Sequence, residues 1–265
     1  AMNVPMFLIL SVLVWKVSPA GTGLINQTAA YVLYALFAVL FIVQFSQIHK
    51  VNAEVLEKGA HASDKYEFKQ VAILAWAYFV TFGSELAVVS MLPGFFMETF
   101  EGLSITVAGA LGGTFAIMNL FARPGGGWFS DRFGRRKSLT LVLVGLAIGY
   151  LVMFLINSQW PLVLAVLVVL CCSFFVQAGC GAVFAVVPLI KRRMTGQIAG
   201  LTGAFGNVGG VTYLTIFTFV DASTFFLIIG VSAIGVVFLT QLLDEPKGHI
   251  TEVLPDGTVQ LIQVG

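Results

Sequence analysis

Long apolar runs, separated by short stretches that hold most of the charges, fill the chain from one end to the other. Each run has about 20 residues, which is what an α-helix needs to cross a hydrocarbon core about 30 Å thick. Hydrophobic residues make up 58% of the chain and charged residues 10%, whereas soluble domains carry about 25% charged residues. The runs also lack the polar alternation of a barrel strand. The sequence therefore predicts an all-α, polytopic helical membrane protein.

Seven of these runs are long enough to be complete membrane spans. We expect them at residues 29–47, 70–92, 104–129, 138–156, 161–189, 197–220 and 222–243. The first apolar stretch, Val4–Trp15, is too short to cross the membrane. It lacks the charged n-region and the cleavage site of a signal peptide, so we interpret it as the end of a further span. A re-entrant segment is the alternative.

Lysine and arginine gather on alternate connections between the expected spans. They lie in the segments 50–69, 132–137 and 191–193 and at Lys247. The intervening connections carry no basic residue, and one of them holds Glu98 and Glu101. Because positively charged loops stay in the cytoplasm, we expect the basic segments and the C-terminal tail, residues 244–265, to be cytoplasmic. Lys16, beyond the short first stretch, is the exception.

The net charge of the chain is +1, and its basic segments are short runs at helix ends. Such runs are typical of topology markers, so no nucleic-acid partner is expected. In the tail, Pro255-Asp256-Gly257 between apolar pairs indicates a small hairpin. An isolated hairpin is marginal in water, so a flexible tail is expected at least equally.

Three cysteines, Cys171, Cys172 and Cys180, share one expected span. Neither a disulfide nor a zinc site with ordinary ligand spacing is expected there. We interpret the cysteines as core residues, and the sequence predicts no metal site and no cofactor.

Arg123 lies inside the apolar run 108–129 and is followed by Pro124 and three glycines. Charged side chains within membrane spans are rare, cost roughly 3 kcal/mol or more at the helix centre, and mostly face a cavity or a ligand. The polar turn Asp131–Lys137 must lie in water, so Arg123 is roughly 10 Å deep at about 1.5 Å per residue. Its side chain tilts toward the midplane, which disfavours an arginine that snorkels to the cytoplasm. Arg123 is therefore the first candidate for ligand binding.

The start of the span at 197–220 is rich in small residues. Small residues at three- and four-residue spacing let helices approach closely in lipid, which explains the pattern as a packing seam. However, Asn207 within the seam has an amide that needs a partner, and Gly206 and Gly209 leave room for a backbone to touch a small ligand. Both interpretations stay open.

The segment Gly127–Arg136 resembles the cytoplasmic signature of the major facilitator superfamily, G-x-x-x-D-R-x-G-R-R. Three further segments resemble the nitrate/nitrite porter family within it: Phe82–Leu86, Ala122–Gly126 and Gly203–Gly210. The resemblance extends from about residue 29 to about residue 243. It implies secondary transport of nitrate or nitrite by alternating access, with a site between two six-helix halves near the membrane midplane.

In this resemblance the chain corresponds to the second half of a facilitator, and the first four helices are missing. Residues 1–47 hold the end of one helix and one full helix of the N-terminal half, and residues 48–69 form the central cytoplasmic loop. Residues 70–243 form the C-terminal six-helix transport bundle. The expected surroundings are the lipid bilayer of the cell (inner/plasma) membrane and the missing N-terminal half, which supplies the rest of the site.

Nitrate is a planar monoanion, and the guanidinium of Arg123 offers a planar fork of donors that can meet two of its oxygens. Asn119 lies one turn earlier on the same helix face. Tyr78 and Phe82 also share a helix face, and the resemblance implies that they are the aromatic pair that lines the anion site. A lipid-facing or packing stripe is the alternative for these two residues. It further assigns Gly206, Asn207 and Gly209 to the nitrate signature.

Glu85 lies on the same face as Tyr78 and Phe82 and has two interpretations. It is a structural partner of a polar group on a neighbouring helix, or it is a proton carrier that couples uptake to the proton gradient. The structural role is favoured, because an ionised carboxylate near the path would repel an anion. Gln177 either donates to the anion or bonds a neighbouring backbone, and the resemblance covers Phe184 on the same helix without assigning it a role.

The resemblance assigns a latch to Asp131, Arg132, Arg135 and Arg136. Such a turn holds neighbouring helices together on the cytoplasmic side in one conformation, and its ion pairs break as the halves rock.

Two alternatives to nitrate transport are a facilitator for another small anion and a non-transporting membrane scaffold subunit. An intramembrane arginine beside three glycines disfavours the scaffold. An enzyme is least expected, because no cluster of nucleophile, base and metal ligands falls at membrane depth.

Overall fold

The computed structural model describes residues 3–59, 64–245, 248–253 and 259–264. Its helices are α1 (Asn3–Val17), α2 (Gln27–Lys58), α3 (Phe68–Thr99), α4 (Ile105–Ile117), α5 (Asn119–Phe133), α6 (Arg135–Met153), α7 (Leu162–Ile190), α8 (Thr195–Phe217) and α9 (Ala222–Thr240). A short 3₁₀ helix, Arg192–Met194, connects α7 to α8. Two strands, β1 (Gly248–Val253) and β2 (Val259–Val264), follow the last helix.

Six helical segments of the described residues are long and apolar enough to cross a membrane: α2, α3, α4 together with α5, α6, α7 and α9. They confirm the prediction of a polytopic helical membrane protein. The remaining expected span, 197–220, coincides with α8, which falls outside this set because glycines, threonines and Asn207 replace large apolar side chains along it. α1 is apolar but shorter than the spans, as its sequence predicts.

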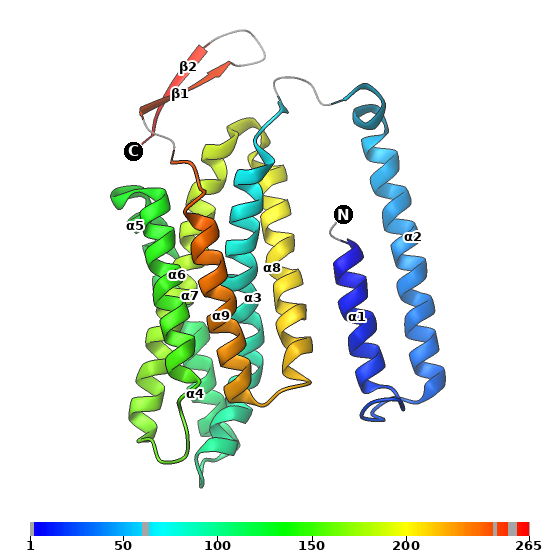
Figure 1. Ribbon diagram of the computed structural model, residues 1–265, viewed down its shortest axis with the longest axis vertical. Helices are drawn as coiled ribbons and strands as arrows, with labels where there is room; N and C mark the ends of the chain where they lie inside the picture. The colour runs from blue at the N-terminus through cyan, green and yellow to red at the C-terminus, as the bar shows by residue number, and fades with distance from the viewer. Residues whose placement is uncertain (1–2, 60–63, 246–247, 254–258, 265) are drawn as a thin grey trace.

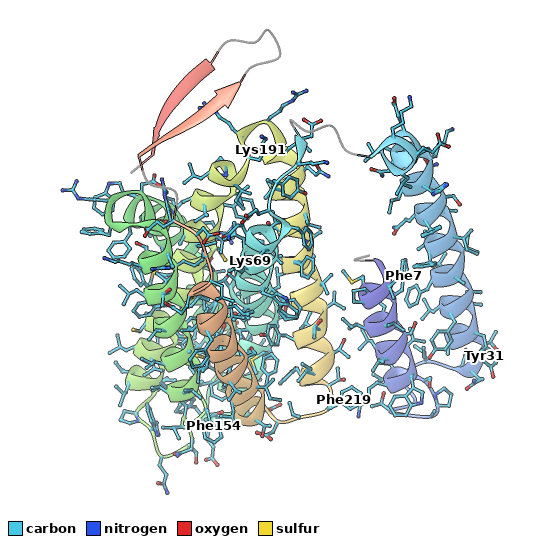
Figure 2. All side chains as sticks on the ribbon, turned by 45° about the horizontal axis from the view of Figure 1, so that its top comes forward. Phe7, Tyr31, Lys69, Phe154, Lys191 and Phe219 are labelled. Atoms are coloured by element: carbon cyan, nitrogen blue, oxygen red, sulfur yellow. The ribbon has the colours of Figure 1, made fainter. Side chains whose placement is uncertain are left out.

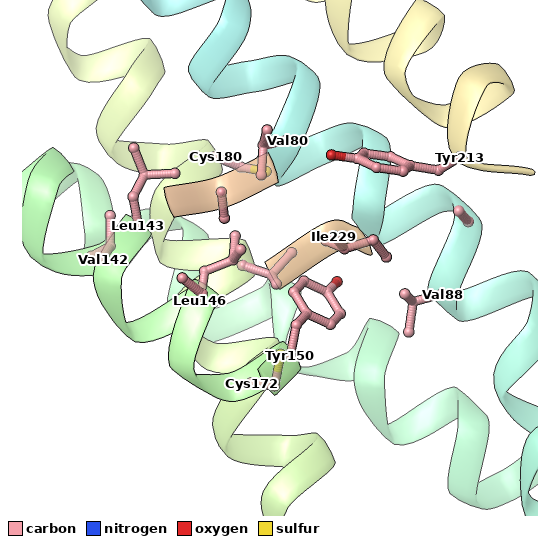
Figure 3. Packing of buried hydrophobic residues seen from close by; sticks show 14 of the residues in the cluster. Val80, Val88, Val142, Leu143, Leu146, Tyr150, Cys172, Cys180, Tyr213 and Ile229 are labelled. Atoms are coloured by element: carbon pink, nitrogen blue, oxygen red, sulfur yellow. The ribbon is translucent and has the colours of Figure 1, made fainter. Parts of the chain in front are cut away.

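α3 lies at the centre of the bundle and packs against α4, α7, α8 and α9 (Figure 1). Its sequence is apolar on nearly all faces, which is typical of a helix surrounded by other helices. Figure 3 shows side chains from several helices meeting in this core, among them Val88 of α3, Tyr150 of α6 and Ile229 of α9. At one edge, α1 packs between α8 and α2, and most of α2 is exposed.

The loop expected at residues 48–69 is shorter than its sequence suggests, because α2 continues to Lys58. The last turns of α2 are rich in alanine, leucine, glutamate and lysine, which favour helix even where the chain has become polar. Lys58 also pairs with Glu54 at 3.1 Å, one turn earlier. The helix ends at Gly59, whose φ of 77° suits a residue without a side chain.

The polar turn expected at Asp131–Lys137 is mostly helical. α5 runs to Phe133 and α6 starts at Arg135, so Gly134 alone forms the break. The φ of Gly134 is 97°, a conformation that glycine adopts readily. The charged residues therefore lie on two helix ends that meet at one point.

β1 and β2 pair in antiparallel register, with Gly248 opposite Val264 and Val253 opposite Val259. A strand pair is the first of the two alternatives left open for the tail. Lys247 and the turn Pro255-Asp256-Gly257 lie outside the described residues.

The basic connections share one end of the bundle. Lys191 lies toward one end in Figure 2, whereas Phe154 and Phe219 lie toward the other. α3, which begins at Phe68, starts at the end of the bundle where α7 connects to α8 in Figure 1. From α3 to α9, the basic connections and the connections without basic residues thus lie at opposite ends of the bundle, as the sequence predicts.

Candidate functional site

Arg123 and Glu85 form an ion pair inside the helical bundle. Nη2 of Arg123 lies 2.8 Å from Oε2 of Glu85, and the side chains are 33% and 10% exposed, respectively. Asn119 Nδ2 donates to Glu85 Oε1 at 3.1 Å. The Sγ of Cys180, which is labelled in Figure 3, lies 3.7 Å from Glu85 Oε2 and donates to it. The carboxylate of Glu85, on α3, therefore accepts from donors on both α5 and α7.

Small residues let these helices approach closely enough for the pair to form. A Cβ on Gly126 would collide with the backbone carbonyl of Ala178, and one on Gly181 would collide with the carbonyl of Arg123. α5 and α7 thus touch backbone to backbone beside the ion pair. Pro124 lies inside α5 and has no N–H to donate to the preceding turn.

Aromatic rings cover one side of the ion pair. Tyr78 and Phe82 stack with their centroids 5.0 Å apart and an interplanar angle of 5°. The ring of Phe184, from α7, meets Tyr78 edge-on at 4.9 Å. The guanidinium carbon of Arg123 lies 5.6 Å from the centroid of Phe82. The charged groups are therefore shielded from water by flat apolar surfaces on this side.

Gly206 of α8 lies against the rings of the aromatic pair. A Cβ at this position would lie 2.6 Å from the Tyr78 ring and 2.8 Å from the Phe82 ring. Five of the residues that the sequence singles out are thus brought together directly, and Gly206 joins them through the rings. The five residues are Tyr78, Phe82, Glu85, Asn119 and Arg123.

Three other predicted residues lie differently. Asn207 is exposed, and its Nδ2 donates to the carbonyl of Gly203 in its own helix at 3.2 Å. Gly209 lies against the backbone of Phe79, so it acts as a contact between α8 and α3. Gln177 is fully buried in α7, and neither of its amide atoms has a hydrogen-bond partner among the described residues.

Sequence reasoning placed all three cysteines in the core, and this is wrong for Cys171, which is exposed. Cys172 and Cys180 are buried. The contact of Cys180 with Glu85 was missed, although Cys180 lies one turn from Gln177 on α7. No group of three or more potential metal ligands occurs within the described part of the chain.

The latch residues lie at the end of the bundle that holds the basic connections. Asp131 and Arg135 form an ion pair across the α5–α6 junction. Arg132 lies over the ring of Trp128, with its guanidinium carbon 5.8 Å from the centroid. Glu245, just beyond α9, reaches the backbone position of Gly134.

A second contact ties the end of α9 to the start of α3. Gln70 accepts from the backbone N–H of Asp244 at 2.9 Å and donates to its carboxylate at 2.5 Å. Together with Glu245, this contact draws the ends of α3, α5, α6 and α9 together.

A helical bundle with six candidate spans and an ion pair among its helices defines a multi-pass membrane protein with a charged internal site. The family model described as the Major Facilitator Superfamily matches residues 2–214 and 74–263, and the chain belongs to that superfamily.

Several curated relatives are similar to most of the chain. The nitrate/nitrite transporter NrtP of Nostoc punctiforme is 43% identical over 93% of this chain and 50% of its own length. NrtP of a Picosynechococcus species is 43% identical over 95% of this chain and 50% of its own length. High affinity nitrate transporter 2.5 of Arabidopsis thaliana is 39% identical over 84% of this chain and 45% of its own length. The chain thus spans about half the length of the curated relatives it matches.

Proposed function

We propose that the chain forms the C-terminal half of a secondary transporter that moves nitrate, nitrite or both by alternating access. The names and the 43% identity of the two NrtP relatives support the substrate. Because the chain spans half of their length, helices beyond it would complete the pathway. In this proposal residues 1–47 belong to the N-terminal half, 48–69 link the halves, 70–243 form the transport bundle and 244–265 form the tail.

The location follows from the charge pattern. The basic connections, the latch and the C-terminal tail lie on the cytoplasmic side of the cell (inner/plasma) membrane in this proposal. The expected partners are the anion, the lipid bilayer and the N-terminal half.

The placement of Arg123 carries the proposal. Its guanidinium lies within the helical bundle, where a charge is expensive, and Glu85 supplies the counter-charge while no anion is bound. Its planar fork matches the geometry of a planar anion, and the stacked rings of Tyr78 and Phe82 provide flat walls beside it. Asn119 adds a neutral donor one turn away.

Two roles remain for Glu85. As a structural partner, its carboxylate neutralises Arg123 and orients it while no anion is bound. As a proton carrier, it would bind a proton when the anion arrives, and uptake would then depend on the proton gradient. Its contacts with Arg123, Asn119 and Cys180 support the first role.

We further propose that Asp131, Arg132, Arg135 and Arg136 form a latch that is closed in one conformation of the cycle. The ion pair between Asp131 and Arg135 and the approach of Glu245 support this role, because all three lie where helix ends meet. These contacts would break when the halves rock.

Uptake of labelled nitrate and nitrite into cells that lack nitrate transport tests the proposal, using the whole protein. Arg123→Lys keeps the charge but removes the planar fork, so we expect uptake at low substrate to fall roughly tenfold or more. Lys58→Arg, an exposed charge-preserving exchange, is the control. Normal uptake by Arg123→Lys would refute the site. Transport of another small anion that nitrate does not compete for would favour the first alternative, and no transport at all would favour the scaffold.

The pH dependence of uptake separates the two roles of Glu85. If Glu85 carries the proton, Glu85→Gln abolishes the pH dependence of nitrate uptake. An unchanged pH profile in this variant would eliminate the carrier role and leave the structural one.

A further inference from the structure

Gln177 is the most unusual polar side chain in the bundle. It is fully buried in the middle of α7, and neither its amide oxygen nor its amide nitrogen has a hydrogen-bond partner among the described residues. Folded proteins pair nearly all of their buried polar groups, and an unpaired amide destabilises the state that contains it. A conformation in which this amide is paired would therefore be favoured by that contact.

Helix geometry places Gln177 beside the ion pair. Residues three and four positions apart share a helix face, so Gln177 lies on the face of Cys180 and Gly181. Cys180 touches the carboxylate of Glu85, and Gly181 touches the backbone of Arg123. The face of α7 that carries Gln177 thus meets both partners of the ion pair.

Glu85 competes with an incoming anion for the guanidinium of Arg123. A guanidinium binds a planar anion most strongly through two parallel N–H groups. Nη2 belongs to both edges that can do this, and Glu85 already holds it at 2.8 Å. Nε of Arg123 is buried and has no hydrogen-bond partner within the described residues, so one donor remains unused.

From the unpaired amide of Gln177 and the occupied Nη2 of Arg123 we infer that the Glu85 carboxylate exchanges one partner for another. It pairs with Arg123 when the site is empty, and it accepts from the amide of Gln177 when an anion occupies Arg123. Asn119 continues to hold the other carboxylate oxygen in both positions. Gln177 is then a positioning residue that promotes anion binding through Glu85, without touching the anion. The inference rests on the proposed function, because it requires that Arg123 binds the anion.

A double-mutant cycle on the purified whole protein tests this, with nitrate binding measured by calorimetry. Gln177→Met keeps the volume and removes both polar atoms. It should weaken nitrate binding roughly tenfold, in line with a lost hydrogen bond to a charged group. Its melting temperature without nitrate should be unchanged or higher, because the lost amide has no partner there. In a Glu85→Gln background, the same exchange should leave nitrate affinity nearly unchanged.

Ser173→Ala is the matched control, one turn away on the same helix. Ser173 is buried, and its hydroxyl donates to the carbonyl of Phe115 at 2.6 Å. This exchange should lower the melting temperature and leave nitrate affinity unaltered, which is the opposite signature. Gln177→Leu provides a second apolar variant if Gln177→Met does not reach the membrane.

Two results would overturn the inference. The first is unchanged affinity in Gln177→Met. The second is an equal loss of affinity with and without Glu85→Gln, which would mean that Gln177 binds the anion directly. Failure of the wild-type protein to bind either nitrate or nitrite would instead refute the proposed function, and this inference with it.

Discussion

Arg123 and Glu85 place two opposite charges next to each other inside the bundle. Removing one partner of a buried pair typically costs about 3–5 kcal/mol, because the other charge is left uncompensated. A third of the Arg123 side chain is exposed, so solvent screens part of that cost. An anion at Arg123 could take the place of the missing carboxylate.

We therefore expect Glu85→Gln to destabilise the whole protein by about 2 kcal/mol in nitrate-free buffer. Nitrate should restore most of this loss, since it supplies a counter-charge to Arg123. Thermal unfolding with and without nitrate measures both effects. Lys58→Gln breaks an exposed pair whose side chains are 72% and 80% exposed, and it should stay within about 0.5 kcal/mol of the wild type. Equal stabilities of Glu85→Gln and wild type would contradict the role of the pair.

The absence of a side chain at Gly206 leaves room for the rings of Tyr78 and Phe82 in their observed positions. In Gly206→Ala the new methyl group would displace the rings of Tyr78 and Phe82, and Phe82 lies beside the guanidinium of Arg123. We expect the KM for nitrate to rise several-fold with the protein still present in the membrane. Gly203→Ala, in the same helix, meets nothing within 4 Å and should leave KM unaltered. Equal KM values in the two variants would show that the rings do not shape the site.

Among the secondary-structure elements, the contact between α5 and α7 holds the site together. Lipid offers little hydrophobic drive for helices to associate, so close packing of small residues has to supply it. The contacts of Gly126 with the backbone of Ala178 and of Gly181 with the backbone of Arg123 do this along the segment of α5 that carries Arg123.

Gly126→Ala should separate α5 from α7, because the opposing atom is a backbone carbonyl that cannot move aside. We expect a loss of roughly 2 kcal/mol or more in stability, comparable to overpacking a core. Gly125→Ala is an adjacent control that meets nothing within 4 Å. Thermal unfolding of the two variants measures the difference, and equal melting temperatures would disprove the tight contact.

Hydropathy predicted where the helices cross the membrane, but it could not predict where they end. The polar turns of α2 up to Lys58 are helical because of local propensity and a helical ion pair. A hydropathy pattern stops at the water interface, whereas a helix stops at a residue such as Gly59 or Gly134. The same limit explains why Asp131–Phe133 was expected to be a turn.

In the whole molecule, the order of the helices makes two ends of different charge. The basic α5–α6 and α7–α8 connections lie at one end in Figure 1, and the α3–α4 connection, which holds Glu101, lies at the other. If the basic end is cytoplasmic, Glu101→Cys should react with a membrane-impermeant maleimide in intact cells. Lys65→Cys should react only after the cells are permeabilised. The reverse pattern would invert the topology.

The site was only partly predictable from sequence, for a reason of packing. Tyr78, Phe82 and Glu85 share one helix face, so their grouping follows from helical spacing alone. The contact of Glu85 with Arg123 and Cys180 depends on how three helices approach one another, which spacing within one helix does not report. The exposure of Asn207 depends likewise on which face of α8 meets α3.

An experimental structure of the whole protein with nitrate or nitrite bound tests whether an anion binds at Arg123. We expect density for the anion within hydrogen-bond distance of the Arg123 guanidinium, beside the rings of Tyr78 and Phe82. We also expect that Glu85 has left Nη2 of Arg123. An anion bound elsewhere, with the pair between Arg123 and Glu85 intact, would refute the proposed site.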